Sequence, residues 1–144
     1  MIEPPRPREE LRVSLDHLQG ILNSLSDGLM VIDESFRVLM ANKALAARFQ
    51  PGCSEQELAG ESCYFVSHGR LTPCEPPEFE CPAKVVWLTG NATRTVHVHR
   101  DAAGNESFVE VSASPLKSID GRVTEVVEII RDVTEEKRLQ EEVL

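Results

Sequence analysis

The four cysteines of this chain are the residues whose type and spacing are best suited to chemistry. Cys53, Cys63, Cys74 and Cys81 lie in one stretch that also contains His68, and the sequence has no cysteine elsewhere. Thiolates are soft ligands for zinc, Cu(I) and iron–sulfur clusters, and imidazole suits zinc and iron. In a chain without a secretory signal, this clustering favours metal or redox chemistry over structural disulfides.

Two sets of four ligands satisfy a tetrahedral metal site. Cys63, Cys74, Cys81 and His68 provide three thiolates and one imidazole, whereas Cys53 in place of His68 gives four thiolates. Four thiolates suit an iron–sulfur cluster, which would make the domain a sensor of oxygen or redox state. The mixed set suits zinc equally well, and zinc there can be purely structural. The spacing matches neither a zinc ribbon nor a ferredoxin, so the ligands must converge from separate turns.

The same thiols also permit roles without any cofactor. Cys74 can form a reversible disulfide with Cys63 or Cys81, and cysteines are often buried as small apolar side chains. A cysteine–histidine catalytic pair with His68 lacks any accompanying substrate-binding signature, so the chain is expected not to be an enzyme. The sequence leaves the choice between metal site, thiol switch and structural thiols open.

Aromatic and histidine residues elsewhere in the chain indicate a functional role less strongly than the cysteines do. Tyr64 and Phe65 are candidates for lining a cofactor pocket or for anchoring the loop, and Trp87 is expected in the core. His97 and His99 share one face of a strand, and such a pair can hold a metal. Half-exposed polar positions are the more common role for such histidines.

These residues must be positioned by a small α+β domain. Alternating patterns and turn residues predict strands at 28–32, 37–41, 93–100, 107–115 and 122–131. Helices are predicted over 9–25, from the cap Asn42 to Phe49, and over 83–89, where Gly90 ends the helix. This order favours a five-stranded antiparallel sheet with helices on one side.

Amphipathic helices are expected at both ends. Leucines recur at helical spacing at Leu11, Leu15, Leu18, Leu22 and Leu25. This seam fits a helix laid against its own domain and equally a helix pair in a dimer. The tail at 133–144 is charged, with Leu139 and Val143 as its apolar side, and suits the start of a coiled-coil linker.

Composition limits the partners. The chain has 144 residues, 41% of them hydrophobic, which suits one globular domain. Its formal net charge of -9 argues against nucleic-acid binding and against docking on an anionic membrane. No apolar run approaches the roughly 18 residues that span a bilayer, and the N-terminus lacks the apolar core of a signal peptide. A cytoplasmic location is expected.

Three segments resemble the PAS family of sensory domains. Residues 21–33 resemble the PAS entry helix and first strand, residues 38–44 resemble the second strand and next helix, and Arg131-Asp-Val-Thr-Glu-Glu-Lys-Arg138 resembles the closing Asp-Ile-Thr motif. The resemblance covers about residues 15–140. It implies a PAS fold and a non-enzymatic sensory module, usually one part of a histidine kinase, a diguanylate cyclase or a transcriptional activator.

The chain has no phosphate-cradling glycine loop and no basic recognition helix. An output domain is therefore expected outside it, covalently linked in a parent protein such as a two-component histidine kinase. A homodimer through the N- and C-terminal helices is also expected. The expected organisation is a flexible lead-in at 1–8, an N-terminal helix at 9–27, a PAS core at 28–132 and the start of a linker helix at 133–144.

The cysteine segment resembles a signature found in a subset of bacterial PAS sensor domains. It reads Cys63-Tyr-x3-His68-Gly-x3-Pro-Cys74, followed by Cys81-Pro. The resemblance implies motif positions for these three cysteines and His68 and leaves Cys53 outside. The expected function is sensing of redox state, oxygen or metal through zinc or an iron–sulfur cluster, with either His68 or Cys53 as fourth ligand.

Overall fold

The computed structural model describes residues 6–50, 52–68, 81–100 and 103–143, and it confirms the predicted α+β class. The helices are α1 (Pro7–Asn23), α2 (Lys43–Phe49), the 3₁₀ helix η1 (Glu55–Leu58), α3 (Cys63–His68), α4 (Pro82–Thr89) and α5 (Thr134–Val143). The strands are β1 (Gly28–Ile32), β2 (Val38–Ala41), β3 (Thr93–Arg100), β4 (Glu106–Lys117) and β5 (Val123–Asp132). The sequence did not predict α3 and η1, and the other elements begin and end within a residue or two of their predicted bounds.

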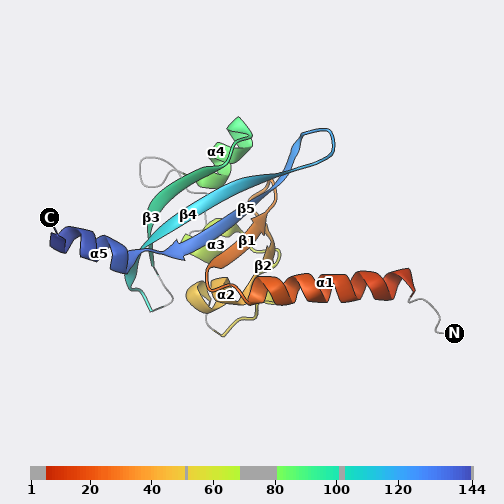
Figure 1. The fold of residues 1–144 in the computed structure, drawn as a ribbon, viewed down its shortest axis with the longest axis horizontal. Helices are drawn as coiled ribbons and strands as arrows, with labels where there is room; N and C mark the ends of the chain where they lie inside the picture. The colour runs from red at the N-terminus through yellow and green to blue at the C-terminus, as the bar shows by residue number, and fades with distance from the viewer. Residues whose placement is uncertain (1–5, 51, 69–80, 101–102, 144) are drawn as a thin grey trace.

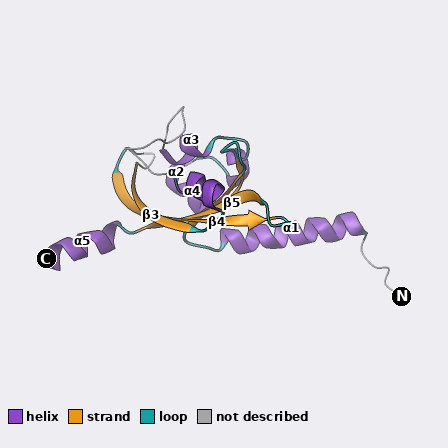
Figure 2. Cartoon of the chain, turned by 90° about the horizontal axis from the view of Figure 1, so that it is seen from above, coloured by secondary structure: helices purple, strands orange, loops and turns teal. Residues whose placement is uncertain are grey.

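The five strands form one antiparallel sheet in the order β2-β1-β5-β4-β3, so β5 lies between β1 and β4. The helices α2, α3 and α4 cover one face, which we call the inner face (Figure 2). The helices α1 and α5 extend away from the sheet at opposite ends of the molecule (Figure 1). Within the described ranges, no helix combines the length and hydrophobicity that a bilayer crossing requires.

Alternate residues of the strands fill the core between the inner face and the helices. On β4 and β5 these are Val109, Val111, Ala113, Val126 and Ile130, all of which are buried. The helices contribute Leu45, Phe49, Val66, Ala83 and Val86 to the same cluster. Successive side chains of a strand point to opposite faces, and this is why a period of two residues places a continuous apolar layer under the helices.

The alternation on β3 confirms one prediction and corrects another. Val96 and Val98 lie on one face and His97 on the other, as predicted, but His97 is only 7% exposed whereas the two valines are exposed. The half-exposed position predicted for this histidine is therefore wrong. Strand periodicity separates the two faces but does not tell which of them the helices will cover. The side chain of His99 lies outside the described residues.

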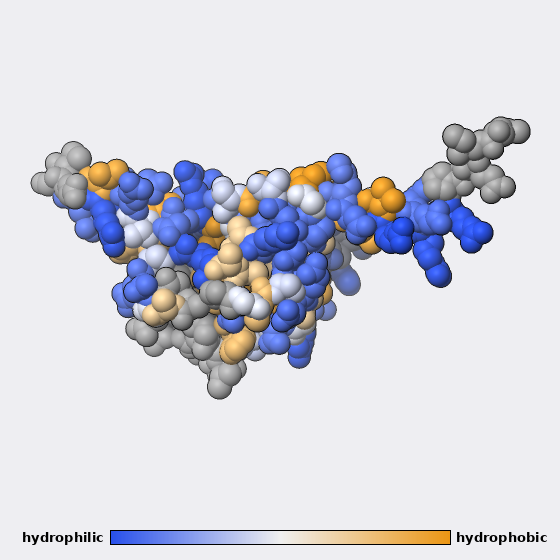
Figure 3. Space-filling view, turned by 90° about the horizontal axis from the view of Figure 1, so that it is seen from below, coloured by the Kyte–Doolittle hydropathy of each residue, from blue (hydrophilic) through white to orange (hydrophobic). Residues whose placement is uncertain are grey.

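The helix α1 projects from the domain, and none of its residues is buried. Its C-terminal end is fastened, because the Oδ1 atom of Asn23 accepts a hydrogen bond from the backbone N–H of Lys43 at 2.9 Å. Leu11, Leu15 and Leu18 of the predicted seam are exposed. Figure 3 shows separate hydrophobic patches on the mostly hydrophilic surface of this arm. The seam is therefore not laid against its own domain, and its role in a dimer stays a prediction.

The side chain of Asn42 makes several hydrogen bonds at the start of β1. Its predicted role as the cap of α2 is confirmed. Its Oδ1 atom accepts hydrogen bonds from the backbone N–H groups of Leu45 and Leu29, each at 3.0 Å. Its amide nitrogen donates to the carbonyls of Leu22 and Asp27, also at 3.0 Å. One fully buried side chain therefore joins the end of α1, the start of β1 and α2.

Asn42→Ala is expected to lower the free energy of unfolding by about 2–4 kcal/mol, because it removes a helix cap and leaves buried backbone groups unsatisfied. Asn91→Ala, at an exposed loop position, is the matched control and should change it by less than about 0.5 kcal/mol. Urea unfolding followed by circular dichroism compares the two variants with the wild type. Equal losses at the two positions would contradict the role of Asn42.

Candidate functional site

Cys63 is held at the start of α3 by the turn between β1 and β2. Its backbone N–H donates to the carbonyl of Phe36 at 2.8 Å, and Phe36 has a left-handed backbone with φ of 62°. Just before Cys63, the N–H of Gly60 donates to the carbonyl of Val38 at 2.7 Å, and the guanidinium of Arg37 donates to the carbonyl of Gly60 at 2.8 Å. The Cys63 side chain is 8% exposed and belongs to the core cluster.

Cys81 lies directly before α4 and packs against the same core cluster as Cys63. Burial raises the pKa of its thiol, and the negative charge of Glu128 acts in the same direction. The backbone N–H groups of Lys84 and Ala83, at the start of the helix, lower the pKa but do not cancel the effect of burial. The thiol is therefore protonated at neutral pH, and a metal must displace a proton to bind it.

A carboxyl group lies on the inner face close to this thiol. Glu128 of β5 is opposite Met30 of β1 and Ala113 of β4 in the register of the sheet. It is 6% exposed, and no hydrogen bond or ion pair holds its carboxylate within the described chain. Burial raises the pKa of Glu128 from its ordinary value near 4.5 to about 7. The core therefore contains a carboxyl group that is close to half ionised at neutral pH.

The structure places two of the predicted ligands against the core. Cys63 belongs to the core cluster and Cys81 packs against it, whereas Cys53 is exposed. Cys74 and the side chain of His68 lie outside the described residues. Among the side chains that are described, no group of three or more histidine, cysteine, aspartate or glutamate residues could hold a metal ion. The complete ligand set therefore stays a prediction.

Three aromatic residues lie near these thiols in the sequence. Tyr64 of α3 packs against the core, which fits the predicted anchoring of the loop, and Phe65 is exposed. Trp87 of α4 packs against the core cluster, as predicted. Its indole N–H is buried and has no hydrogen-bond partner in the described part of the chain. The role of Tyr64 and Phe65 in a cofactor pocket stays a prediction.

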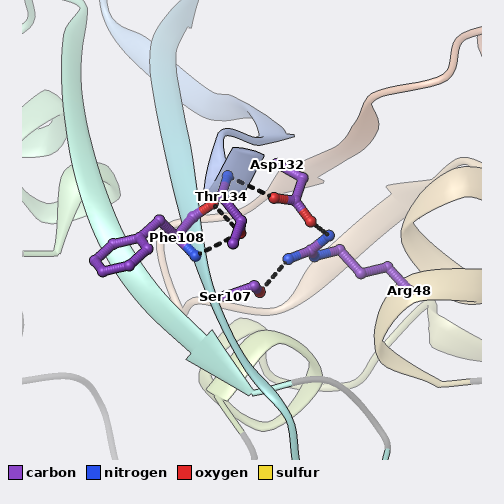
Figure 4. A network of polar contacts seen from close by, with 5 residues as sticks. All are labelled: Arg48, Ser107, Phe108, Asp132 and Thr134. Carbon is purple, nitrogen blue, oxygen red and sulfur yellow. Dashed lines mark hydrogen bonds and ion pairs between the residues drawn. The ribbon is translucent and has the colours of Figure 1, made fainter. Parts of the chain in front are cut away.

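A polar network at the end of β5 fastens α5 to the sheet (Figure 4). The Oδ1 atom of Asp132 accepts from the backbone N–H of Thr134 at 2.9 Å, and the Thr134 hydroxyl accepts from the backbone N–H of Phe108 at 2.9 Å. Arg48 of α2 lies 2.9 Å from the Oδ2 atom of Asp132 and also donates to the hydroxyl of Ser107. The network thus joins the helical layer, two strands and the exit helix.

The charge of Asp132 is stabilised by this network. Partial burial raises the pKa of Asp132, but hydrogen bonds from the side chain and backbone of Thr134 and from Arg48 outweigh it, so the pKa lies below its ordinary value. A carboxylate with a lowered pKa contributes stability above its unfolded pKa and loses it as the pH falls through the folded value. The link between α5 and the domain is therefore complete at neutral pH and weakens in acid.

The sheet order, the helices on its inner face and the Asp-Val-Thr exit at 132–134 define a class of sensory domain. A family model described as PAS fold matches residues 22–138. The chain belongs to the PAS family, which confirms the resemblance seen in the sequence. No curated protein matches the chain in sequence. The match to the PAS family does not test the resemblance of the cysteine segment to a subset of bacterial PAS sensor domains, and that resemblance stays a prediction.

Solved structures agree on the fold. The PAS domain of a protein from Colwellia psychrerythraea has a TM-score of 0.66 at 15% identity, covering 85% of this chain and 98% of that domain. The PAS domain of Bordetella pertussis BvgS has a TM-score of 0.57 at 15% identity, covering 90% and 94%. An RNA-binding light-oxygen-voltage receptor has a TM-score of 0.66 at 23% identity, covering 94% of this chain but 37% of the receptor. At these identities the likeness establishes the fold alone.

Sequence reasoning misses two residues of these sites. Glu128 does leave a signal, because it is a charge in the inward-facing series that includes Val126 and Ile130. A charged residue at the apolar phase of a strand is uncommon unless it is paired or functional. Arg48 leaves no signal, since its partner Asp132 comes close only through the topology of the sheet.

Glu128→Gln is expected to stabilise the domain more at high pH than at low pH. The unfolded chain releases this proton near pH 4.5 and the folded chain near pH 7, so the cost of the buried charge grows across that window. The advantage of the variant in unfolding free energy should increase by about 3 kcal/mol between pH 4.5 and pH 8. Urea unfolding at both pH values measures it, with Glu125→Gln on the opposite face of β5 as control. A gain in the unfolding free energy of Glu128→Gln that does not change with pH would contradict the raised pKa of Glu128.

Proposed function

We propose that this PAS domain is the non-enzymatic sensory unit of a longer signalling protein and reads redox state, oxygen or metal through its cysteine segment. The observation that carries the proposal is that Cys63 and Cys81, which begin two separate helices, pack against one core cluster. Thiols that border one core cluster from the starts of two helices support a metal centre or a reversible disulfide. In the cytoplasm, where we place the domain, they stay reduced until a stimulus acts.

The proposed centre uses Cys63, Cys74, Cys81 and His68. The exposed position of Cys53, apart from the core cluster, favours this mixed set over four thiolates. Three thiolates and one imidazole complete a tetrahedral zinc site, and a cluster with a histidine ligand is the iron–sulfur alternative. Because the Cys81 thiol is protonated in the metal-free protein, loading of the site releases a proton.

Protein purified under strict exclusion of oxygen is expected to contain metal. Stoichiometric zinc in colourless protein indicates the zinc site, and iron with sulfide and a broad brown absorbance indicates the cluster. Cys63→Ser and Cys81→Ser should lose most of the metal, because each removes a thiolate ligand. Cys53→Ser is the matched control and should keep it. Elemental analysis and absorption spectra measure the content, and circular dichroism checks the fold of each variant.

Absence of metal from the anaerobic protein would overturn the metal centre. The alternative is a thiol–disulfide switch, which the position of Cys63 and Cys81 at one core cluster also supports. It requires a disulfide of Cys74 with one of these two residues that forms reversibly at a physiological potential. Signalling in the parent protein that survives replacement of all three cysteines by serine would leave a ligand-free dimerisation module as the function.

We propose that the signal leaves through β5 and α5 to an output domain outside this chain. The strand β5 carries Glu128, whose charge acts on Cys81, and ends at Asp132, which holds the first turn of α5 through Thr134. A change of state at the thiols can therefore act on β5 through the electrostatic interaction of Cys81 with Glu128, and β5 leads directly to the exit. Such a switch works if the two states bind the stimulus with different affinity.

We also propose that α1 pairs with α1 of a second copy and that α5 continues this pairing. The exposed leucines Leu11, Leu15 and Leu18 follow the spacing of a helix-to-helix seam. The outer face of the sheet adds the exposed apolar side chains of Val96 and Val98. Exposed apolar side chains of this kind are typical of an interface between protein chains.

Leu15→Glu is expected to weaken the dimer by about tenfold or more, because it places a charge within the seam. His17→Glu adds the same charge on the opposite side of α1 and should leave the association unchanged. Size-exclusion chromatography with light scattering over a dilution series measures both. A monomeric wild type, or equal effects of the two substitutions, would overturn the dimer.

A further inference from the structure

The hairpin between β4 and β5 carries an apolar side chain at its tip, where it projects beyond the rest of the sheet (Figure 1). Ile119 lies in this turn and is fully exposed. Turns are usually made of glycine, proline and small polar residues, so a large β-branched side chain is unusual there. Lys117 and Arg122, on either side of the turn, are exposed as well. The hairpin therefore presents an apolar tip between two basic side chains.

A network of hydrogen bonds stabilises this turn. The backbone N–H of Ser118 donates to the carbonyl of Arg122, and that of Gly121 donates to the carbonyl of Ser118, each at 2.9 Å. The carboxylate of Asp120 accepts from the backbone N–H of Arg122 at 3.0 Å and from the hydroxyl of Ser118. The acidic group of the turn is thus bound within it. A tip that is already ordered loses little conformational entropy when it docks against a partner.

An open hollow lies near the other end of β5, between α5 and the outer face of the sheet. Its volume is about 290 Å³, which is small for a ligand pocket and suits a single apolar side chain. Val96 and Val133 are its apolar lining residues, and Glu110 and Glu136 contribute carboxylates. The remaining lining residues are Arg131, Lys137 and Gln140. The hollow thus combines an apolar part with negative charge at its rim.

The two carboxylates of the hollow can accept a basic partner. The Oε1 atom of Glu110 lies 3.6 Å from the Nε atom of Arg94, and that of Glu136 lies 4.0 Å from a terminal nitrogen of Arg131. Both distances exceed those of a hydrogen bond, and both arginines are exposed, so these ion pairs contribute little. The basic side chains of the hairpin can therefore take the place of these arginines. The hollow and the hairpin tip are complementary in charge and in apolar character.

We propose that Ile119 of one copy of this domain docks in the hollow beside α5 of a second copy. The hairpin and the hollow lie at opposite ends of β5, whose ten residues span about 33 Å, so a chain cannot fill its own hollow. A contact between two different surfaces is head-to-tail, and it leaves one hairpin and one hollow free for further copies. The contact places the hairpin of one sensory domain against the exit helix of the next. It rests neither on the proposed thiol centre nor on the proposed pairing of α1.

The test uses the Leu15→Glu chain as its background, so that the proposed pairing of α1 does not contribute, with the thiols reduced and metal removed by a chelator. Analytical ultracentrifugation follows the mass up to about 1 mM protein, because so small a contact is weak. The background chain should form dimers and, at higher concentration, larger species. Adding Ile119→Asp should weaken this association by about tenfold or more, because a charge replaces the apolar tip. Val96→Asp should have the same effect from the side of the hollow.

Leu88→Asp and Val98→Asp are the matched controls. Both residues are exposed and apolar, Leu88 on α4 and Val98 on the same face of β3 as Val96, and neither lines the hollow. Both controls should associate as the background chain does, and circular dichroism checks the fold of every variant.

Mixing the Ile119→Asp chain with the Val96→Asp chain gives the decisive result. The first chain keeps an intact hollow and the second keeps an intact hairpin, so the mixture should form a 1:1 complex that does not grow further. A background chain that stays monomeric at about 1 mM, equal effects of the test and control substitutions, or no complex on mixing would overturn the proposal.

Discussion

The register of β5 between β1 and β4 is the constraint on which both sites depend. The pairing of Glu128 with Met30 on one side and Ala113 on the other fixes which residues of this strand face the helices. A slip of one residue would turn the carboxyl of Glu128 outward and carry Asp132 away from Arg48. One strand therefore sets both the polarity of the core beneath α4 and the geometry of the exit.

Most of the fold could be predicted because each element leaves a local signal. Alternating apolar residues mark the strands, Asn42 marks the start of α2, and Gly90 marks the end of α4. The helix α3 is only six residues long and lies in the proline-rich stretch, so it leaves no comparable period. His97 shows the limit of a strand pattern, because only the packing of helices decides which face becomes the interior.

The candidate sites show the same difference between features with a local sequence signal and features without one. The cysteines could be found because thiols are rare and clustered, and the structure places Cys63 and Cys81 on one core cluster. The contact between Arg48 and Asp132 joins residues far apart in the chain, so it follows from topology and not from any local motif. The sequence therefore predicts functional residues that are clustered in one segment. It misses functional residues that only the topology of the sheet brings together.

The energetics of the exit suit a switch. The bonds of Thr134 to Asp132 and to the backbone of Phe108 tie α5 to neighbouring strands. The ion pair of Arg48 with Asp132 is partly exposed, and such pairs contribute on the order of 1 kcal/mol or less. A stimulus that moves the helical layer can therefore release Arg48 at small cost while α5 stays attached. In the proposed function, α5 then keeps its attachment to β5, the strand through which the signal leaves.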